Sequence, residues 1–291
     1  METTVFAPAK INLTLDVTGR REDGYHLVET VMQAVSLFDR VTVREEKGKG
    51  IRLRTDDERI PGDASNTAYR AAEAFFQAAG LPPVGLEIRL EKFIPMQAGL
   101  AGGSADAAGV LVALNELTDA RLELDTLCEA GSRVGADVPF CVMGGAALCT
   151  GTGTILSPLP SIPECHIVIA KPSRGVSTAE AYRRIDESAP RRRPHTSVMV
   201  DAVCAGELST MGRELCNVFE QAIALPEVSA IKAVMREYRT LGCLMTGSGS
   251  AVFGLFEGRD EARRCAESLR KTIEEVVLCR PCAHGPTAEP N

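Results

Sequence analysis

Residues 95–109 decide the fold of this chain, and they read Pro-Met-Gln-Ala-Gly-Leu-Ala-Gly-Gly-Ser-Ala-Asp-Ala-Ala-Gly. Gly99, Gly102 and Gly103 leave the backbone uncovered by side chains just before a leucine-rich segment with helical spacing, which we expect to begin near Ser104. The backbone N–H groups of such a loop and the positive end of the helix dipole favour an anion. The stretch therefore predicts a phosphate-binding loop, although a tight turn is an equally common origin of a glycine-rich pattern.

Two familiar phosphate-binding loops fit this stretch poorly. A P-loop requires Gly-Lys-Ser/Thr at the end of the glycine run, whereas here Gly103 is followed directly by Ser104. A dinucleotide-binding loop follows the first strand of a parallel sheet, whereas the segments before this loop have the pattern of hairpin-connected strands. A lysine that reaches the phosphates must therefore come from another part of the chain.

The first predicted strand, residues 9–18, supplies the leading candidate for that lysine. Polar and apolar residues alternate along it, so Lys10 and Asn12 lie on one face while Ile11 and Leu13 lie on the other. This alternation predicts a half-buried strand. A lysine on the polar face of such a strand is commonly only solvated, and the spacing alone leaves that alternative open.

The other segments of the first half alternate between strand and helix patterns. Asn66 is suited to cap a helix whose apolar residues repeat with helical spacing until Gly80 ends it. A shorter helix over residues 124–133 precedes the segment 135–140. In this segment Asp137 either caps a turn or takes part in the chemistry of a site. Extended segments are predicted over residues 26–37, 40–45, 50–55 and 84–93.

A proline-spaced segment, residues 157–163, marks the predicted boundary between two domains. Prolines interrupt both helices and strand ladders and favour an extended linker. We therefore expect one domain over residues 1–160 and a second over residues 161–291.

Two features of the second domain could concern a ligand. Gly247, Ser248 and Gly249 lie between two predicted strands, where they form either a plain hairpin or a loop that closes over a ligand. The run of three arginines at residues 191–193 lies between two prolines, and a short charge run of this kind is predicted to be a solvated loop.

Composition limits the classes of partner. The chain has 291 residues, 45% of them hydrophobic and 24% charged, so it can bury a large core. A net charge of −7 argues against general binding to nucleic acid or to an anionic membrane. The sequence contains neither a secretion-signal pattern nor an apolar run long enough to span a membrane, so we expect a cytoplasmic protein whose partner is a small molecule.

The ten cysteines are predicted to be reduced thiols of the core. Most of them stand singly in apolar surroundings, which differs from the spacing of a disulfide framework. Cys279 and Cys282 form a Cys-x-x-Cys pair, but no second pair completes a zinc site. We assign these two residues no role and predict no metal ligand in the chain.

Four separated segments together resemble the GHMP kinase family, which is named for galactokinase, homoserine kinase, mevalonate kinase and phosphomevalonate kinase. They are Pro8-Ala-Lys-Ile-Asn-Leu13, residues 95–108, Gly135-Ala-Asp-Val-Pro-Phe140 and residues 245–253, in matching order and with approximately matching spacing. The resemblance extends from about Val5 to Cys279. It implies an α+β fold of two domains, the first ribosomal-protein-S5-like and the second ferredoxin-like, with ATP and substrate bound between them.

The resemblance also implies the roles of individual residues toward ATP. Asp137 would be the catalytic base and Lys10 its electrostatic partner, while Mg²⁺ would accompany ATP. Asn66 would contact the nucleoside of ATP, although helix capping already accounts for it. The ATP phosphates would be held by the loop residues Pro95, Met96, Gln97, Ala98, Gly99, Leu100, Ala101, Gly102, Gly103 and Ser104.

Residues 19–26, 135–140 and 171–182 narrow the resemblance to those members that phosphorylate the 2-hydroxyl of a cytidine diphosphate-linked methylerythritol, in the non-mevalonate isoprenoid pathway. Another small alcohol, such as mevalonate or homoserine, is one alternative substrate, and a non-catalytic nucleotide-binding protein of the same fold is another alternative. We expect a monomer or weak homodimer. The substrate would contact Asn12, Tyr25, His26, Asp137, Tyr182, Gly247, Ser248 and Gly249.

Overall fold

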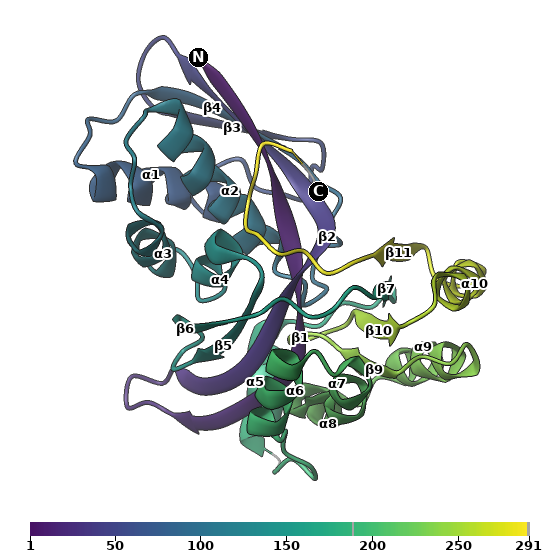
Figure 1. Ribbon diagram of the computed structural model, residues 1–291. Helices are drawn as coiled ribbons and strands as arrows, with labels where there is room; N and C mark the ends of the chain where they lie inside the picture. The colour runs from purple at the N-terminus through teal and green to yellow at the C-terminus, as the bar shows by residue number, and fades with distance from the viewer. Residues whose placement is uncertain (188, 290–291) are drawn as a thin grey trace.

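The computed structural model describes residues 1–187 and 189–289, and two sheets organise it (Figure 1). The first sheet has seven strands, in the order β3-β4-β2-β1-β8, with β5 paired to β2 and β6 paired to β5. Its strands are β1 (Glu2–Arg20), β2 (His26–Glu46), β3 (Ile51–Thr55), β4 (Gly85–Glu91), β5 (Ala146–Thr150), β6 (Ile155–Leu159) and β8 (Cys216–Asn217). The long antiparallel pair β1 and β2 extends through both parts of the molecule.

The second sheet has four antiparallel strands, in the order β11-β7-β10-β9. These strands are β7 (His166–Lys171), β9 (Gly242–Met245), β10 (Val252–Phe256) and β11 (Glu275–Cys279). The helices of the first half are α1 (Thr67–Ala79), α2 (Gly102–Leu117), α3 (Leu124–Ser132) and α4 (Val138–Met143). Those of the second half are α5 (Thr178–Glu187), α6 (Thr196–Ala205), α7 (Leu208–Glu214), α8 (Val218–Ile223), α9 (Pro226–Glu237) and α10 (Arg259–Leu269). The predicted α+β class is confirmed.

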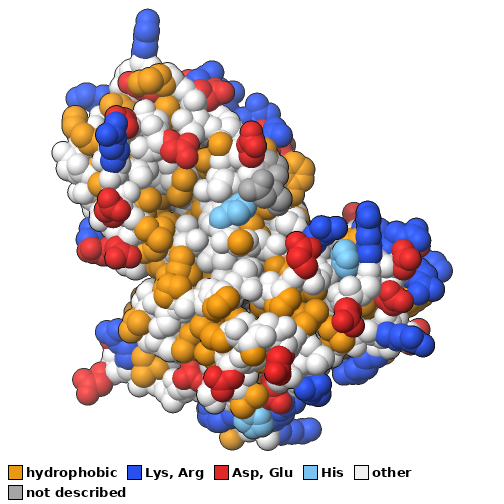
Figure 2. Space-filling view, in the orientation of Figure 1, with side chains coloured by type: hydrophobic (Ala, Val, Ile, Leu, Met, Phe, Trp, Pro, Cys, Tyr) orange, Lys and Arg blue, Asp and Glu red, His pale blue; other side chains and the backbone are white. Residues whose placement is uncertain are grey.

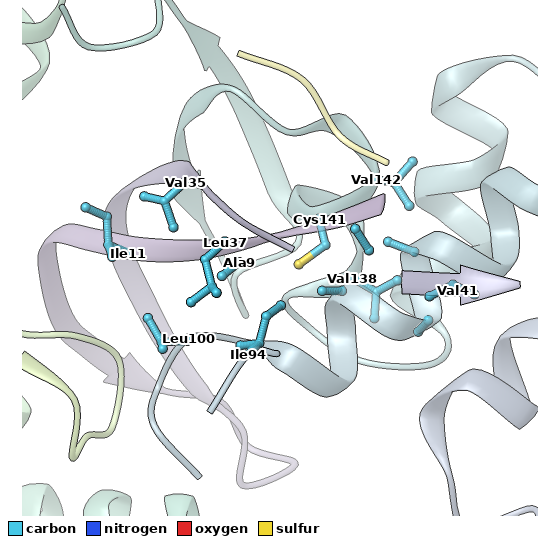
Figure 3. Close-up of a cluster of buried hydrophobic side chains, with 14 of the residues drawn as sticks. Ala9, Ile11, Val35, Leu37, Val41, Ile94, Leu100, Val138, Cys141 and Val142 are labelled. Carbon is cyan, nitrogen blue, oxygen red and sulfur yellow. The ribbon is translucent and has the colours of Figure 1, made fainter. Parts of the chain in front are cut away.

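The core of the first half joins elements that are far apart in the sequence (Figure 3). Ala9 of β1 and Leu37 of β2 are buried in one cluster with Leu100 of the glycine loop and with Val138 and Cys141 of α4. Burying a leucine or valine side chain stabilises the folded state by about 1.5–3 kcal/mol. The same core therefore positions the backbone on each side of Lys10, the glycine loop and Asp137.

The prediction that the first strand is half-buried is wrong. Lys10 is 3% exposed and Asn12 is 1% exposed, although they lie on the polar face. The second half of the chain covers this face: Thr246 accepts a hydrogen bond from the backbone N–H of Asn12, and β8 pairs with β1. Lys10 is thus a buried cation and the solvated alternative is excluded.

Helices α1 and α2 begin close to the expected residues. Asn66 caps α1 by accepting a hydrogen bond from the backbone N–H of Ala68, and Gly80 ends the helix in a left-handed conformation. Helix α2 begins at Gly102, two residues earlier than expected, because the left-handed Ala101 already accepts the first helical hydrogen bonds.

The proline-spaced segment, residues 157–163, is more than a linker between two domains, because part of it belongs to a strand of the first sheet. The residues after β11 also return to the first sheet. Pro158 belongs to the edge strand β6, opposite Ala147 of β5, where a missing N–H costs no ladder bond. Beyond β11, the tail returns to the first sheet (Figure 1): the backbone N–H of Cys282 donates to the carbonyl of Ala34 at 2.9 Å. The boundary near residue 160 stays a prediction.

The arginine run is not simply a solvated loop. Nη1 of Arg193 donates to Oδ1 of Asp16 at 2.8 Å and to the carbonyl of Val17 at 3.1 Å. Asp16 is only 7% exposed, so its carboxylate takes the arginine as its counterion. Arg193 thereby attaches this loop to β1, which corrects the expectation for that residue.

The two glycine loops pack directly on each other. The backbone N–H of Ala251 donates to the carbonyl of Ala98 at 3.1 Å. A Cβ added at Gly99 would lie 2.1 Å from the carbonyl oxygen of Thr246, and one added at Gly247 would lie 2.8 Å from the carbonyl oxygen of Gly99. Only glycine permits this approach of two backbones.

We therefore predict that Gly99→Ala destabilises the protein more than Gly80→Ala does. Both glycines have a positive φ, of 75° and 62°, but a Cβ at Gly80 meets nothing within 4 Å. Backbone strain alone should cost each variant about 1–2 kcal/mol, and the contact with Thr246 should add to this cost in Gly99→Ala. Thermal unfolding measures both, and equal melting temperatures for the two variants would contradict the prediction.

Candidate active site

A cavity of about 1540 Å³ brings together most of the predicted site residues. Its walls come from β1, the turn between β1 and β2, both glycine loops, α5 and the residues before α4. Figure 2 shows charged side chains mainly toward the outer ends of the molecule and largely uncharged atoms where the two parts meet. The predicted residues that line the cavity are Lys10, Asn12, Tyr25, His26, residues 95–104, Asp137, Tyr182, Gly247, Ser248 and Gly249.

Lys10 and Asp137 form an ion pair, with 3.7 Å between Nζ and Oδ2. Asp137 is the residue before α4, but its side chain makes no capping hydrogen bond. The carboxylate is instead directed to Lys10, and its side chain is 34% exposed whereas that of Lys10 is 4% exposed. The pair thus combines a buried cation with a carboxylate that is open to the cavity.

Asn12 orients Lys10. Nζ of Lys10 donates to Oδ1 of Asn12 at 2.7 Å, and the same oxygen accepts the backbone N–H of Gly247 at 3.0 Å. Nδ2 of Asn12 donates to Oγ1 of Thr30 at 2.8 Å. The amide of Asn12 therefore has protein partners on both its oxygen and its nitrogen.

The glycines of the first loop have different tasks. Gly99 lines the cavity and is also required for contact with the second glycine loop, where there is no room for a Cβ. Gly102 and Gly103 occupy the first turn of α2, and Ala101 before them provides no side-chain cap. The first N–H groups of a helix need acceptors from outside it, so this turn is suited to an anion.

The structure does not bring Asn66 into the cavity. Its Oδ1 accepts the N–H of Ala68 at 2.8 Å and its Nδ2 donates to the carbonyl of Pro61 at 2.9 Å. Both groups of the side-chain amide are thus used in capping α1. The neighbouring Thr67 and Arg70 line the cavity instead.

The aromatic residues form a separate wall. His26 stacks on Tyr182, with ring centroids 4.4 Å apart and an angle of 22° between the planes. Burial raises the pKa of the Tyr182 phenol to about 12, so the ring is neutral at physiological pH. Tyr25 is 68% exposed and leaves a large aromatic surface open at the mouth of the cavity.

A buried charge cluster beside the glycine loop was not predicted from the sequence. Nζ of Lys92, which lines the cavity, donates to Asp39 and to Oδ2 of Asp106. Asp39 also accepts the backbone N–H groups of Phe93 and Ile94. The only sequence signal was polar residues interrupting apolar segments, which does not reveal that three of them meet.

Asp106 is the carboxyl of this cluster that burial favours in its protonated form. Burial raises the pKa of its carboxyl to about 7, while the attraction of Lys92 opposes that rise. Oδ1 of Asp106 has no hydrogen-bond partner among the described residues, whereas Asp39 is stabilised as an anion by two N–H groups. Two carboxylates that share one ammonium in the interior favour protonation of the less well solvated one.

Within residues 1–187 and 189–289, no group of three or more His, Cys, Asp or Glu side chains is arranged to hold a metal ion. Among the helices of the same part of the chain, none combines the length and the apolar character needed to cross a membrane.

Comparison with known proteins gives the class of this one. Residues 66–145 match the family described as GHMP kinases N terminal domain, and residues 199–275 match that described as GHMP kinases C terminal. The chain belongs to the GHMP kinase family and is an ATP-dependent small-molecule kinase.

Individual relatives narrow the class. The chain is 43% identical over 278 residues to a protein of Caldicellulosiruptor saccharolyticus named 4-diphosphocytidyl-2-C-methyl-D-erythritol kinase, covering 95% of this chain and 96% of that one. A crystal structure of 4-(cytidine 5'-diphospho)-2C-methyl-D-erythritol kinase is 38% identical, with a TM-score of 0.78, and the match covers 97% and 99% of the two chains. A homoserine kinase from Cytophaga hutchinsonii has a TM-score of 0.80 at 23% identity, covering 98% and 96%, and shares the fold.

The raised pKa of Asp106 predicts how stability changes with pH. Because its folded-state pKa of about 7 lies above the ordinary value of 3.8, the native state retains a proton that the unfolded chain releases. This contribution to stability is complete below pH 4 and is lost as the pH rises through 7. The free energy of unfolding of the wild type should therefore fall, relative to that of Asp106→Asn, between pH 4 and 7.

Urea unfolding at a series of pH values measures this difference. Asp119→Asn is the matched control, because its side chain is 75% exposed and pairs only with Arg121 among the described residues. Parallel pH profiles for the wild type and Asp106→Asn would contradict the assignment of the proton to Asp106.

Proposed function

We propose that this protein uses ATP to phosphorylate the 2-hydroxyl of 4-diphosphocytidyl-2-C-methyl-D-erythritol, a step of the non-mevalonate isoprenoid pathway. The observation that carries the proposal is that the Lys10–Asp137 pair, the glycine loop and the stacked rings of His26 and Tyr182 line one cavity. The nearly full-length similarity to kinases named for this substrate supports it.

In the proposed mechanism Asp137 is the catalytic base. Its exposed carboxylate accepts the proton of the substrate hydroxyl as the oxygen attacks the γ-phosphate. Lys10 lies beside this carboxylate and offers positive charge to the transferring phosphoryl group. Nζ of Lys10 donates to Oδ1 of Asn12 at 2.7 Å, so the ammonium is already oriented before the substrate binds.

The ATP phosphates are proposed to bind at residues 95–104, through the backbone N–H groups at the beginning of α2. Mg²⁺ is proposed to arrive with ATP, since phosphate oxygens and water usually supply most of its ligands. The ion would neutralise phosphate charge during transfer.

The cytidine end of the substrate is proposed to lie against the aromatic wall. The ring of Tyr25 is exposed and could stack on a base. The ring of Tyr182 stacks on His26 and holds it in place. Stacking of a base on an aromatic ring contributes about 1–3 kcal/mol. Gly247, Ser248 and Gly249 would face the diphosphate or methylerythritol part, and Asn12 would lie close to the reacting hydroxyl.

Two alternative functions have weaker support. Mevalonate or homoserine as substrate would leave the Tyr25-His26 segment without a task, and the likeness to a homoserine kinase at 23% identity concerns the fold alone. A non-catalytic nucleotide-binding protein has no need of the Lys10–Asp137 pair. We further propose a monomer or weak homodimer with no nucleic-acid partner, acting in the cytoplasm, where its ten free cysteines stay reduced.

A direct assay tests the substrate. The purified protein, incubated with ATP, Mg²⁺ and diphosphocytidyl-methylerythritol, should release ADP and form a product with one added phosphate, detected by mass spectrometry. Mevalonate and homoserine serve as controls and should give no product. Turnover of a control without turnover of the cytidyl compound would refute the proposed substrate.

Asp137→Asn tests the base. The amide preserves the size of the side chain but does not accept a proton, so kcat should fall about 10²- to 10⁴-fold while KM for both substrates changes little. Asp125→Asn, in the first turn of α3, is the matched control and should retain the wild-type kcat. Asp137 would not be the base if its variant turned over at nearly the normal rate.

A further inference from the structure

A carboxylate on α5 contacts the histidine of the aromatic wall. Oδ1 of Asp186 lies 2.8 Å from Nε2 of His26, and Oδ2 lies 3.5 Å from Nη1 of Arg20. The hydrogen bond with His26 lowers the pKa of the Asp186 carboxyl, so this carboxylate is ionised at neutral pH. Nothing in the proposed phosphoryl transfer requires Asp186, although α5 holds it against the site.

This contact decides which nitrogen of His26 carries the proton. An ionised carboxylate can only accept a hydrogen bond, so the neutral imidazole places its proton on Nε2 and leaves a lone pair on Nδ1. The stacking on Tyr182 fixes the plane of the ring. Among residues 1–187 and 189–289, none forms a hydrogen bond with Nδ1, so this acceptor is available to a ligand.

The two sides of the ring face different spaces. His26 lines the large cavity and also a smaller one of about 450 Å³ beside it, whereas Asp186 lines only the smaller one. The Nε2 edge, which contacts Asp186, is therefore directed to the smaller cavity. The rest of the ring lines the large cavity, where the base of the substrate is proposed to bind.

We propose that Asp186 is a positioning residue for pyrimidine specificity: it holds the His26 tautomer whose Nδ1 accepts a hydrogen bond from the exocyclic amino group of cytosine. Uracil has a carbonyl oxygen at that position, so the same nitrogen would face a second acceptor. A site that leaves polar groups unpaired discriminates strongly against the wrong ligand. The inference rests on the proposed function, since it concerns the base of the proposed substrate.

Asp186→Asn tests this inference with a minimal change of shape. An asparagine amide can either accept from Nε2 or donate to it, so it no longer fixes the imidazole proton on Nε2, and the tautomer protonated on Nδ1, which lacks the acceptor, becomes populated. Steady-state kinetics with cytidine- and uridine-diphosphate-linked methylerythritol should show a reduced preference for cytidine, by up to about tenfold, the order expected for complete loss of one hydrogen bond. The change should lie in KM, with kcat altered less than about twofold because Lys10 and Asp137 are untouched.

Glu187→Gln is the matched control, because it makes the same charge change one residue further along α5, where Glu187 pairs with Arg183 on the surface. It should retain the wild-type preference. Nitrogen-15 NMR of His26 should report protonated Nε2 in the wild type and an added population protonated on Nδ1 in Asp186→Asn. Equal cytidine preference in the wild type and Asp186→Asn, or an equal loss with both substrates, would overturn the inference.

Failure of the inference can be told apart from failure of the proposed function. If the wild type did not phosphorylate the cytidyl compound, the proposed function would fail, and binding of CDP against UDP by calorimetry would still decide the role of Asp186. Wild-type selectivity for CDP that Asp186→Asn loses would support it. Selectivity that is absent from the wild type or unchanged in Asp186→Asn would refute it.

Discussion

The side-chain amide of Asn12 holds the two halves of the site together. Its oxygen accepts both the ammonium of Lys10 and the backbone N–H of Gly247, which are 237 positions apart in the chain, and its nitrogen donates to Thr30. A buried amide left without partners costs about 1–3 kcal/mol, so each contact depends on the others being formed. The direction of the lysine and the position of the second glycine loop are consequently set by a single residue of β1.

The glycine loop depends on the same arrangement. The backbone N–H of Lys10 donates to the carbonyl of Leu100, and Gly99 lies against Thr246 with no room for a side chain. The loop is therefore supported on both sides by backbone, while helix α2 behind it is anchored in the core. A loop held in this way can present its N–H groups without rearranging, which favours binding of an anion.

The cavity wall contains two lysine–carboxylate groups that differ in burial. The cluster of Asp39, Lys92 and Asp106 is buried, and Lys92 pairs with both carboxylates. Asp137 faces the cavity and is 3.7 Å from Lys10, too far for a strong direct hydrogen bond. A group that must gain and release a proton needs this access, whereas the buried cluster serves to fix the segment that leads from β4 into the glycine loop.

The sequence alone determined the local features: the cap of α1 at Asn66, the glycine loop and its helix, and the face of the first strand that carries Lys10. These follow from spacings of two to four residues, within one strand or one helical turn. Only the tertiary structure decided that this polar face is buried, that Asp137 turns to Lys10 instead of capping α4, and that Asp186 meets His26. The physical reason is that burial and pairing depend on which distant surfaces come together, and the residues of these contacts lie more than 100 positions apart.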